Sequence, residues 1–152
     1  MKILFLDATP GFSPTRLSEK ATGGILTSLT KIPAYLASKG YDVSVCSLHD
    51  KVETVNGVHY IGKPLEKNEW DVVVFNRNMV DREMTAFFKD SYKIWWLHDV
   101  VDHRYLEDDA FRFINKIVAL SKYNLDSYSD FYDIKEENFT IIVRSRQLVW
   151  IA

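Results

Sequence analysis

The sequence predicts an α/β fold: a doubly wound, mostly parallel, Rossmann-like sheet with helices on both faces. Short apolar runs such as Lys2–Leu6 and Trp70–Phe75 end at turn residues, as strands buried on both faces of a parallel sheet do. Segments with helical periodicity lie between these runs, and strands that alternate with helices indicate right-handed crossovers. The length of 152 residues and the 47% hydrophobic content fit one globular domain.

A loop rich in proline, glycine and serine separates the first strand from the first helix. It spans Ala8–Thr22, and a connection this long is more often functional or mobile than a plain link. The helix that follows is expected to end at Gly40, because glycine is favoured just past a helix C-terminus. Its predicted apolar face consists of Ile25, Leu29, Ile32 and Leu36.

The remaining elements follow from the same patterns. Asp42–Ser47 alternates as a strand, and the Asn56–Gly57 pair inside Val52–Ile61 predicts a two-residue hairpin turn. Further expected elements are a strand over Trp70–Phe75, a helix over Val80–Lys89 that buries Met84, Phe87 and Phe88, a strand over Lys93–Leu97, a helix over Leu106–Ile114, a strand over Lys116–Leu120, a helix over Tyr123–Phe131 and a strand over Phe139–Val143.

Composition excludes several classes of protein. Nineteen basic and twenty-one acidic residues give a net charge of −2, so no basic excess favours nucleic acid as a partner. The single cysteine, Cys46, excludes an internal disulfide framework and a thiolate zinc cluster, and it fits a reducing cytosol. The apolar runs are too short to span a membrane, and the first residues do not form a secretory signal. We therefore expect a cytoplasmic protein.

Polar residues follow most of the predicted strands. In doubly wound sheets, ligands bind in the crevice at the carboxyl ends of the strands, so these residues are candidates for a site. The alternative is that any strand leaving the core must end in polar residues. The strand ends are Asp7, Ser47–His49, Asn76–Arg77, His98–Asp99 and Ser121–Lys122.

The Gly23–Gly24 pair opens the first helix and is a candidate anion site. Free backbone N–H groups and the positive end of the helix dipole favour an anion there, and glycine lets it approach closely. The pair belongs to neither the dinucleotide fingerprint nor a P-loop, so a simple loop hinge is an open alternative. Thr22, as a helix cap, would compete for the same N–H groups.

Histidines and carboxylates cluster after the strand over Lys93–Leu97. His98, Asp99, Asp102 and His103 have the ligand types of a metal site, but a strand end and a following turn do not bring them to one point. We expect no metal, and His98 as a hydrogen-bonding or proton-handling group, or a histidine satisfied by Asp99. Arg77 is the best candidate cation for a phosphate. Without a G-x-S-x-G motif, a serine hydrolase is disfavoured.

Seven segments together resemble the N-terminal domain of the GT-B-fold glycosyltransferases, in particular the large retaining family 4, known as glycosyl transferases group 1. No single motif is decisive, but their order and spacing match over residues 1–142. The segments are Met1–Leu6, Thr22–Leu26, Leu36–Val45, Trp70–Phe75, Lys93–Asp99, Ile117–Tyr123 and Phe139–Ile142.

The resemblance implies transfer of a sugar from a nucleotide-diphosphate sugar, the co-substrate, to a hydroxyl of a glycan or small-molecule acceptor, with no other cofactor. It implies that Gly23 and Gly24 approach the donor phosphates and the acceptor, and that His98 hydrogen-bonds the transferred sugar. The other rim residues that it implies are Asp7, Arg77, Asp99 and Ser121. Preorganised N–H groups and cations would stabilise the charge on the departing diphosphate.

The C-terminal segment departs from the family pattern. Residues 143–152 stand where the family continues through a linker into a nucleotide-binding second domain. A truncated chain, a split enzyme completed by a second chain, and a reduced binding protein all fit this departure. The functional alternatives are a non-catalytic carbohydrate- or nucleotide-binding module that kept the fold, and a small metal-dependent hydrolase that uses His98, Asp99, Asp102 and His103. Peripheral contact with a membrane is compatible with the resemblance.

Overall fold

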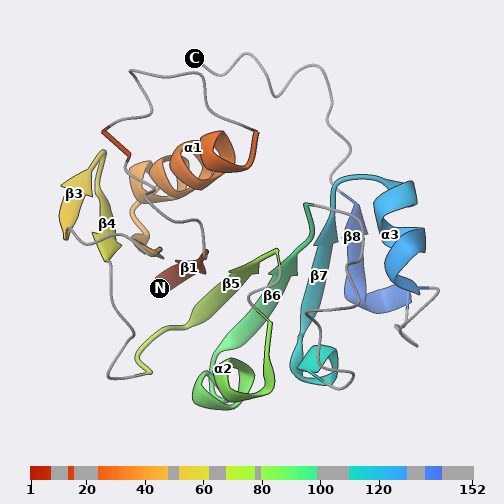
Figure 1. Cartoon of the computed structure of the whole chain (residues 1–152). Coiled ribbons are helices and arrows are strands. Elements are labelled where there is room, and N and C mark those ends of the chain that lie inside the picture. Colours follow the sequence, from red (N-terminus) through yellow and green to blue (C-terminus); the bar gives the residue numbers. More distant parts are fainter. Residues whose placement is uncertain are drawn as a thin grey trace.

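The computed structural model describes residues 1–7, 14–15, 24–47, 52–61, 68–77, 80–98, 110–129 and 136–141. Its centre is one eight-stranded sheet with the order β3-β4-β2-β1-β5-β6-β7-β8 (Figure 1). The strands are β1 (Lys2–Leu6), β2 (Asp42–Cys46), β3 (Glu53–Val55), β4 (Val58–Ile61), β5 (Val72–Asn76), β6 (Tyr92–Trp96), β7 (Lys116–Ala119) and β8 (Phe139–Ile141). The helices are α1 (Gly24–Ser38), α2 (Arg82–Phe87) and α3 (Lys122–Ser129), with 3₁₀ turns η2 (Ala110–Phe113) and η3 (Glu136–Asn138).

All neighbouring strands pair in parallel except β3 and β4, which form an antiparallel hairpin. Asn56 and Gly57 form its turn with φ values of +51° and +77°, the left-handed backbone that a two-residue hairpin requires. The predicted α/β class, with a mostly parallel sheet, is confirmed, as is the predicted hairpin.

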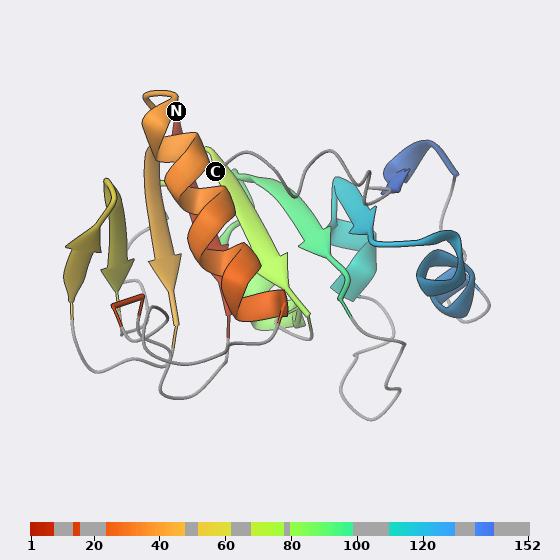
Figure 2. The same cartoon turned by 90° about the horizontal axis from the view of Figure 1, so that it is seen from above.

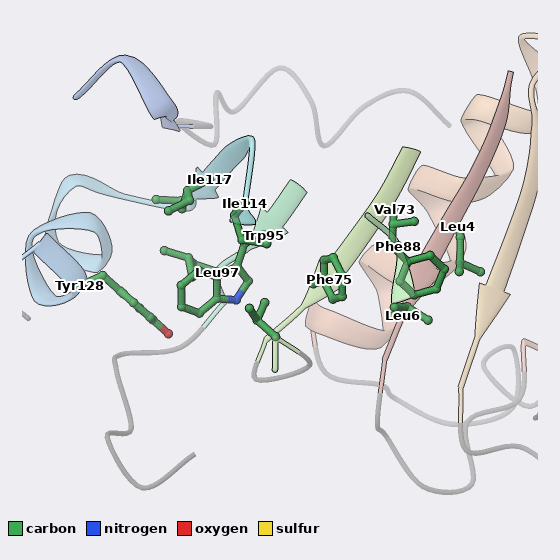
Figure 3. Packing of buried hydrophobic residues seen from close by; sticks show 12 residues of the cluster. Leu4, Leu6, Val73, Phe75, Phe88, Trp95, Leu97, Ile114, Ile117 and Tyr128 are labelled. Atoms are coloured by element: carbon green, nitrogen blue, oxygen red, sulfur yellow. The ribbon is translucent and has the colours of Figure 1, made fainter. Parts of the chain in front are cut away.

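Helices cover both faces of the sheet. α1 packs on one face, where Leu29 joins a cluster with Phe5, Val45 and Val74 (Figure 2). α2 and α3 contribute to the cluster on the other face, where Trp95 and Tyr128 meet edge to face at 5.2 Å between ring centroids (Figure 3). Burial on both faces explains the continuous apolar runs of the strands.

Two predicted core residues are wrong. Ile32 is 38% exposed, because α1 turns Leu29 and Pro33 toward the sheet, four residues apart on one helix face. Phe87 is also 38% exposed, because α2 ends there and the next residue, Phe88, enters the core in its place. The Phe87 ring instead packs edge-on against Phe88, with centroids 4.9 Å apart.

The helix predicted over Leu106–Ile114 is also corrected where the structure describes it. Only a 3₁₀ turn, Ala110–Phe113, precedes β7 there, and residues 99–109 lie outside the described residues. In the described part of the chain, no helix has the length and apolar character needed to cross a membrane.

A buried lysine organises the amino end of β6. Lys93 is 6% exposed, and its Nζ donates to the carbonyl oxygens of Phe88, Lys89 and Ser91 at 3.0, 3.2 and 2.9 Å. These carbonyls follow α2, where a helix end leaves acceptors unsatisfied. Burial lowers the pKa of Lys93, and the nearby Asp90 carboxylate acts in the opposite direction. Lys93 therefore joins the end of α2 to the sheet.

Candidate functional site

A row of polar side chains crosses four neighbouring strands at the carboxyl edge of the sheet. The hydrogen bonds between strands continue one residue past the ends of β1 and β2. The Asp7 amide donates to the Cys46 carbonyl at 2.9 Å, and the Ser47 amide donates to the Ile61 carbonyl at 3.2 Å. The strand register then aligns Ser47 with Asp7, Asp7 with Asn76, and Asn76 with Trp96. We call these four residues the edge row.

The edge row faces α1. Side chains alternate between the faces of a strand, so each row residue shares the face of the residue two positions earlier. Phe5, Val45 and Val74 lie in the cluster under α1, and Trp96 belongs to the same cluster. α1 connects two parallel strands and so returns antiparallel to them, which places its first residue, Gly24, at the carboxyl edge (Figure 2). The polar row therefore lies where this fold class binds ligands.

Asp7 and Asn76 form the centre of the row. The Asn76 side-chain amide donates a hydrogen bond to Asp7 Oδ2, and the two residues are 3% and 0% exposed. A buried carboxylate is costly unless donors compensate its charge. The amide of Asn76 supplies one such donor, so it fixes the orientation of the Asp7 carboxylate.

Arg77 leaves β5 in a left-handed conformation. Its φ is +54°, which is uncommon for a residue other than glycine and is held only where surrounding contacts demand it. Its backbone amide donates to the Trp96 carbonyl at 3.1 Å, and its own carbonyl accepts from Trp95 Nε1 at 2.5 Å. Its Nε lies 4.0 Å from Asp7 Oδ2, and its side chain is partly exposed. The turn thus holds the Arg77 guanidinium beside the Asp7 carboxylate of the edge row.

His98 lies beside Trp96, just past the end of β6. Their ring centroids are 4.4 Å apart with the rings tilted by 46°, and His98 is half-buried. They are two positions apart in an extended segment, so both side chains lie on the α1 side. The row thus ends in an aromatic pair that includes a group able to exchange a proton near neutral pH.

Three buried polar atoms of the edge row have no hydrogen-bond partner within the part of the chain that the structure describes. They are Ser47 Oγ, Asn76 Oδ1 and Trp96 Nε1. Most buried polar groups in proteins are paired, so three such atoms in one row are unusual. Together they offer one hydroxyl, one acceptor and one donor beside the Asp7 carboxylate.

The structure brings some of the predicted site residues together. Asp7 and Arg77 approach each other at the row, and His98 follows the end of the adjacent strand, β6. Gly24 is the first residue of α1 and is exposed. Gly23 and Asp99 lie outside the described residues.

Ser121 accepts two hydrogen bonds at the start of α3. Its Oγ accepts a hydrogen bond from the Asn124 amide at 3.0 Å, and its carbonyl accepts from the Leu125 amide at 3.1 Å. These contacts cap the N-terminus of α3. The structure therefore gives Ser121 a capping role, and its role at the rim stays a prediction.

Sequence reasoning did not select three members of the row. The sequence indicates Ser47 and Asn76 only as parts of polar strand ends, and Trp96 only as part of the predicted strand over Lys93–Leu97. One feature of the sequence is common to the three residues. Each lies two positions after an apolar strand residue that is on the α1 face of the sheet. The lateral register that aligns them is a property of the assembled sheet.

Other chemistries find less support among the described residues. No group of three or more histidine, cysteine, aspartate or glutamate side chains there could hold a metal ion. Asp99, Asp102 and His103, the other possible ligand types near His98 in the sequence, lie outside that part of the chain. Burial raises the pKa of the half-buried Cys46 thiol, which disfavours the reactive thiolate.

Comparison with known proteins identifies the fold. No family model matches the sequence, and no curated protein matches it significantly. Solved structures do match: WaaG, a glycosyltransferase involved in lipopolysaccharide biosynthesis, has a TM-score of 0.62 at 14% identity over 92% of this chain and 44% of that one. Sucrose-phosphate synthase from Thermosynechococcus elongatus has a TM-score of 0.62 at 9% identity, over 93% of this chain and 47% of that one.

At these identities the matches establish the fold alone, and this chain spans less than half of each of these two structures. The eight-stranded, mostly parallel sheet and its two helical layers are the features that it shares with them. The chain therefore has the α/β fold found in solved GT-B glycosyltransferases.

Proposed function

We propose that this chain supplies the acceptor-binding half of a glycosyltransferase that moves a sugar from a nucleotide-diphosphate sugar to an acceptor hydroxyl. The observation that carries the proposal is the convergence of Asp7, Arg77 and His98 at the carboxyl ends of three adjacent strands. The fold shared with glycosyltransferases supports this assignment. The finer assignment to retaining family 4 rests on the motif resemblance of residues 1–142.

The chemistry of glycosyl transfer matches the groups at this edge. Breaking a glycosyl–phosphate bond leaves negative charge on the diphosphate and positive charge on the sugar. A second component that binds the nucleotide would hold the diphosphate, while Arg77 and the N-terminus of α1 add positive potential on this side. His98 would hydrogen-bond the transferred sugar, and Asp7 would accept from hydroxyl groups. The acceptor and a nucleotide sugar are the expected ligands.

The test measures release of nucleoside diphosphate from a panel of nucleotide sugars. The chain is assayed alone and with a lysate of the cells that produce it, since the second component is part of the proposal. We expect turnover only in the supplemented reaction. His98→Ala should lower it at least a hundredfold, because the residue would contact the sugar.

The matched control is His59→Ala. His59 is exposed on β4, and its Nδ1 shares a hydrogen bond with Thr54 at 3.1 Å, away from the carboxyl edge. This variant should retain wild-type turnover. Absence of turnover with every sugar, supplemented or not, would remove the enzymatic proposal and favour a binding module. Full turnover in His98→Ala would remove the role of His98.

A further inference from the structure

We propose that the edge row (Ser47, Asp7, Asn76 and Trp96) is a binding site for the hydroxyl groups of a neutral polyol, and that it discriminates against phosphate. The inference deepens the proposed function by naming the chemical group that this edge receives. It rests on that function only for the role of the polyol as an acceptor. Its basis is the set of three buried polar atoms in one row that have no hydrogen-bond partner among the described residues.

The first step concerns folding. A buried polar atom without a partner costs about 1–3 kcal/mol, so the row does not contribute to stability through these atoms. Ser47 Oγ, Asn76 Oδ1 and Trp96 Nε1 come from β2, β5 and β6, separated in sequence and aligned only in the sheet. Their alignment at the ligand-binding edge favours a shared ligand over three unrelated defects.

The second step is the chemistry of the ligand. A hydroxyl group donates one hydrogen bond and accepts others. It can donate to Asn76 Oδ1 while it accepts from Trp96 Nε1, two residues that are register partners on adjacent strands. The Oγ of Ser47 can donate or accept, so it fits a second hydroxyl.

The third step excludes phosphate from the same position. An ionised phosphate at neutral pH is charged and presents mainly hydrogen-bond acceptors, so it satisfies the Asn76 Oδ1 acceptor less well than an alcohol does. It would also meet the negative charge of the buried Asp7 carboxylate. Arg77 is not a member of the edge row. Its Nε lies 4.0 Å from the Asp7 carboxylate, which already compensates part of its positive charge. A neutral polyol avoids both penalties.

The test uses the Trp96 indole as a reporter. Its N–H signal is followed in ¹H–¹⁵N spectra of the whole chain during titration with methyl α-D-glucopyranoside, myo-inositol and, separately, inorganic phosphate at constant ionic strength. We expect a saturable shift of the Trp96 signal with at least one polyol and no saturable shift with phosphate. Trp96→Phe assigns the signal by its loss.

Trp70 provides an internal control. Its Nε1 is also buried without a partner in the described part of the chain, but it precedes β5 at the amino edge. Its signal should stay constant in every titration. No Trp96 shift with either polyol up to 100 mM would mean that the row receives solvent alone, and the proposal would be wrong. Equal shifts of Trp70 and Trp96, or a saturable shift with phosphate, would also overturn it.

A pair of serine variants tests the residues of the row. Ser47→Ala removes an unpartnered hydroxyl, so it should weaken polyol affinity about two- to tenfold without lowering the denaturation midpoint. Ser44→Ala is the matched control, because Ser44 is equally buried on the opposite face of β2. It should leave affinity unchanged. Unchanged affinity in Ser47→Ala, or equal losses in both variants, would contradict the proposed site.

These results are distinguishable from failure of the transferase. Polyol binding is measured on this chain alone, with no nucleotide and no second component. Binding without turnover would support the row as a polyol site while removing the enzymatic proposal. Turnover without a Trp96 shift would leave the transferase in place and reject the edge row as its polyol site.

Discussion

The Asn76 amide donates a hydrogen bond to the Asp7 carboxylate across the boundary between β1 and β5, and both side chains are buried. They are 69 residues apart in the sequence and become neighbours through the parallel pairing of their strands. This bond fixes the carboxylate that lies 4.0 Å from Arg77 Nε. It therefore joins the stability of the sheet to the geometry of the candidate site.

The bond between Asp7 and Asn76 predicts coupled losses of stability. Asp7→Ala and Asn76→Ala each remove one partner of a buried, charge-assisted hydrogen bond, which costs about 2–4 kcal/mol including the cavity. The double variant should be less destabilised than the sum of the two by about 1.5–3 kcal/mol. Urea denaturation of the four proteins measures this coupling. Additive losses would show that the bond makes no independent contribution.

The three carbonyl contacts of Lys93 predict a large effect of its removal. Lys93→Met keeps the apolar stem but leaves the carbonyls of Phe88, Lys89 and Ser91 without the ammonium, at an expected cost of about 2–4 kcal/mol. Lys116→Met is the control on the neighbouring strand. Its Nζ makes an exposed bond to the Glu137 carbonyl, so the cost should stay below about 0.5 kcal/mol. Similar denaturation midpoints for the two variants would contradict the capping role.

Tyr60 predicts a loss of stability at alkaline pH. Burial, assisted by the Glu53 carboxylate, raises its pKa to about 12, above the value of about 10 for an exposed tyrosine. The contribution of the protonated Tyr60 to the free energy of unfolding is thus fully present below pH 10. It is lost as the pH rises from about 10 to 12, because the unfolded chain releases the proton first. The expected slope approaches about 1.4 kcal/mol per pH unit.

Tyr60→Phe tests this slope. The free energy of unfolding is measured between pH 8 and 11.5 for the wild type and the variant, and their difference should shrink above pH 10. Tyr35→Phe alters an exposed tyrosine on α1 and should follow the wild-type pH profile. Parallel profiles for wild type and Tyr60→Phe would show that Tyr60 does not carry the alkaline loss.

The left-handed backbone at Gly57, in the β3–β4 turn, predicts that the stability of variants there depends on the residue type. A Cβ at Gly57 would meet Ala37 Cβ at 3.5 Å, an ordinary contact, so the cost of Gly57→Ala comes from its φ of +77°. We expect about 1–2 kcal/mol for alanine and a smaller loss for Gly57→Asn, because asparagine tolerates the left-handed region. Thermal denaturation compares the two. An asparagine variant less stable than the alanine variant would reject backbone strain as the cause.

Local patterns predict the skeleton of the fold because their causes are local. Apolar runs bounded by turn residues located β1 without error, and Asn56–Gly57 located the hairpin, since its left-handed turn needs these residue types. The same patterns predicted Ile32 and Phe87 on the apolar, buried faces of their helices, but both side chains are exposed. Whether an apolar residue on a helix is covered depends on where that helix rests on the sheet, which distant residues decide.

The candidate site divides in the same way. The sequence by itself determined that polar residues, Asp7 and His98 among them, follow buried strands and so meet at one edge of a parallel sheet. Only the tertiary structure decided that Asn76 orients Asp7, that Arg77 turns back toward it, and that Ser121 caps α3. Strand register, burial and a left-handed turn arise from pairing between segments far apart in the chain. No local pattern specifies them.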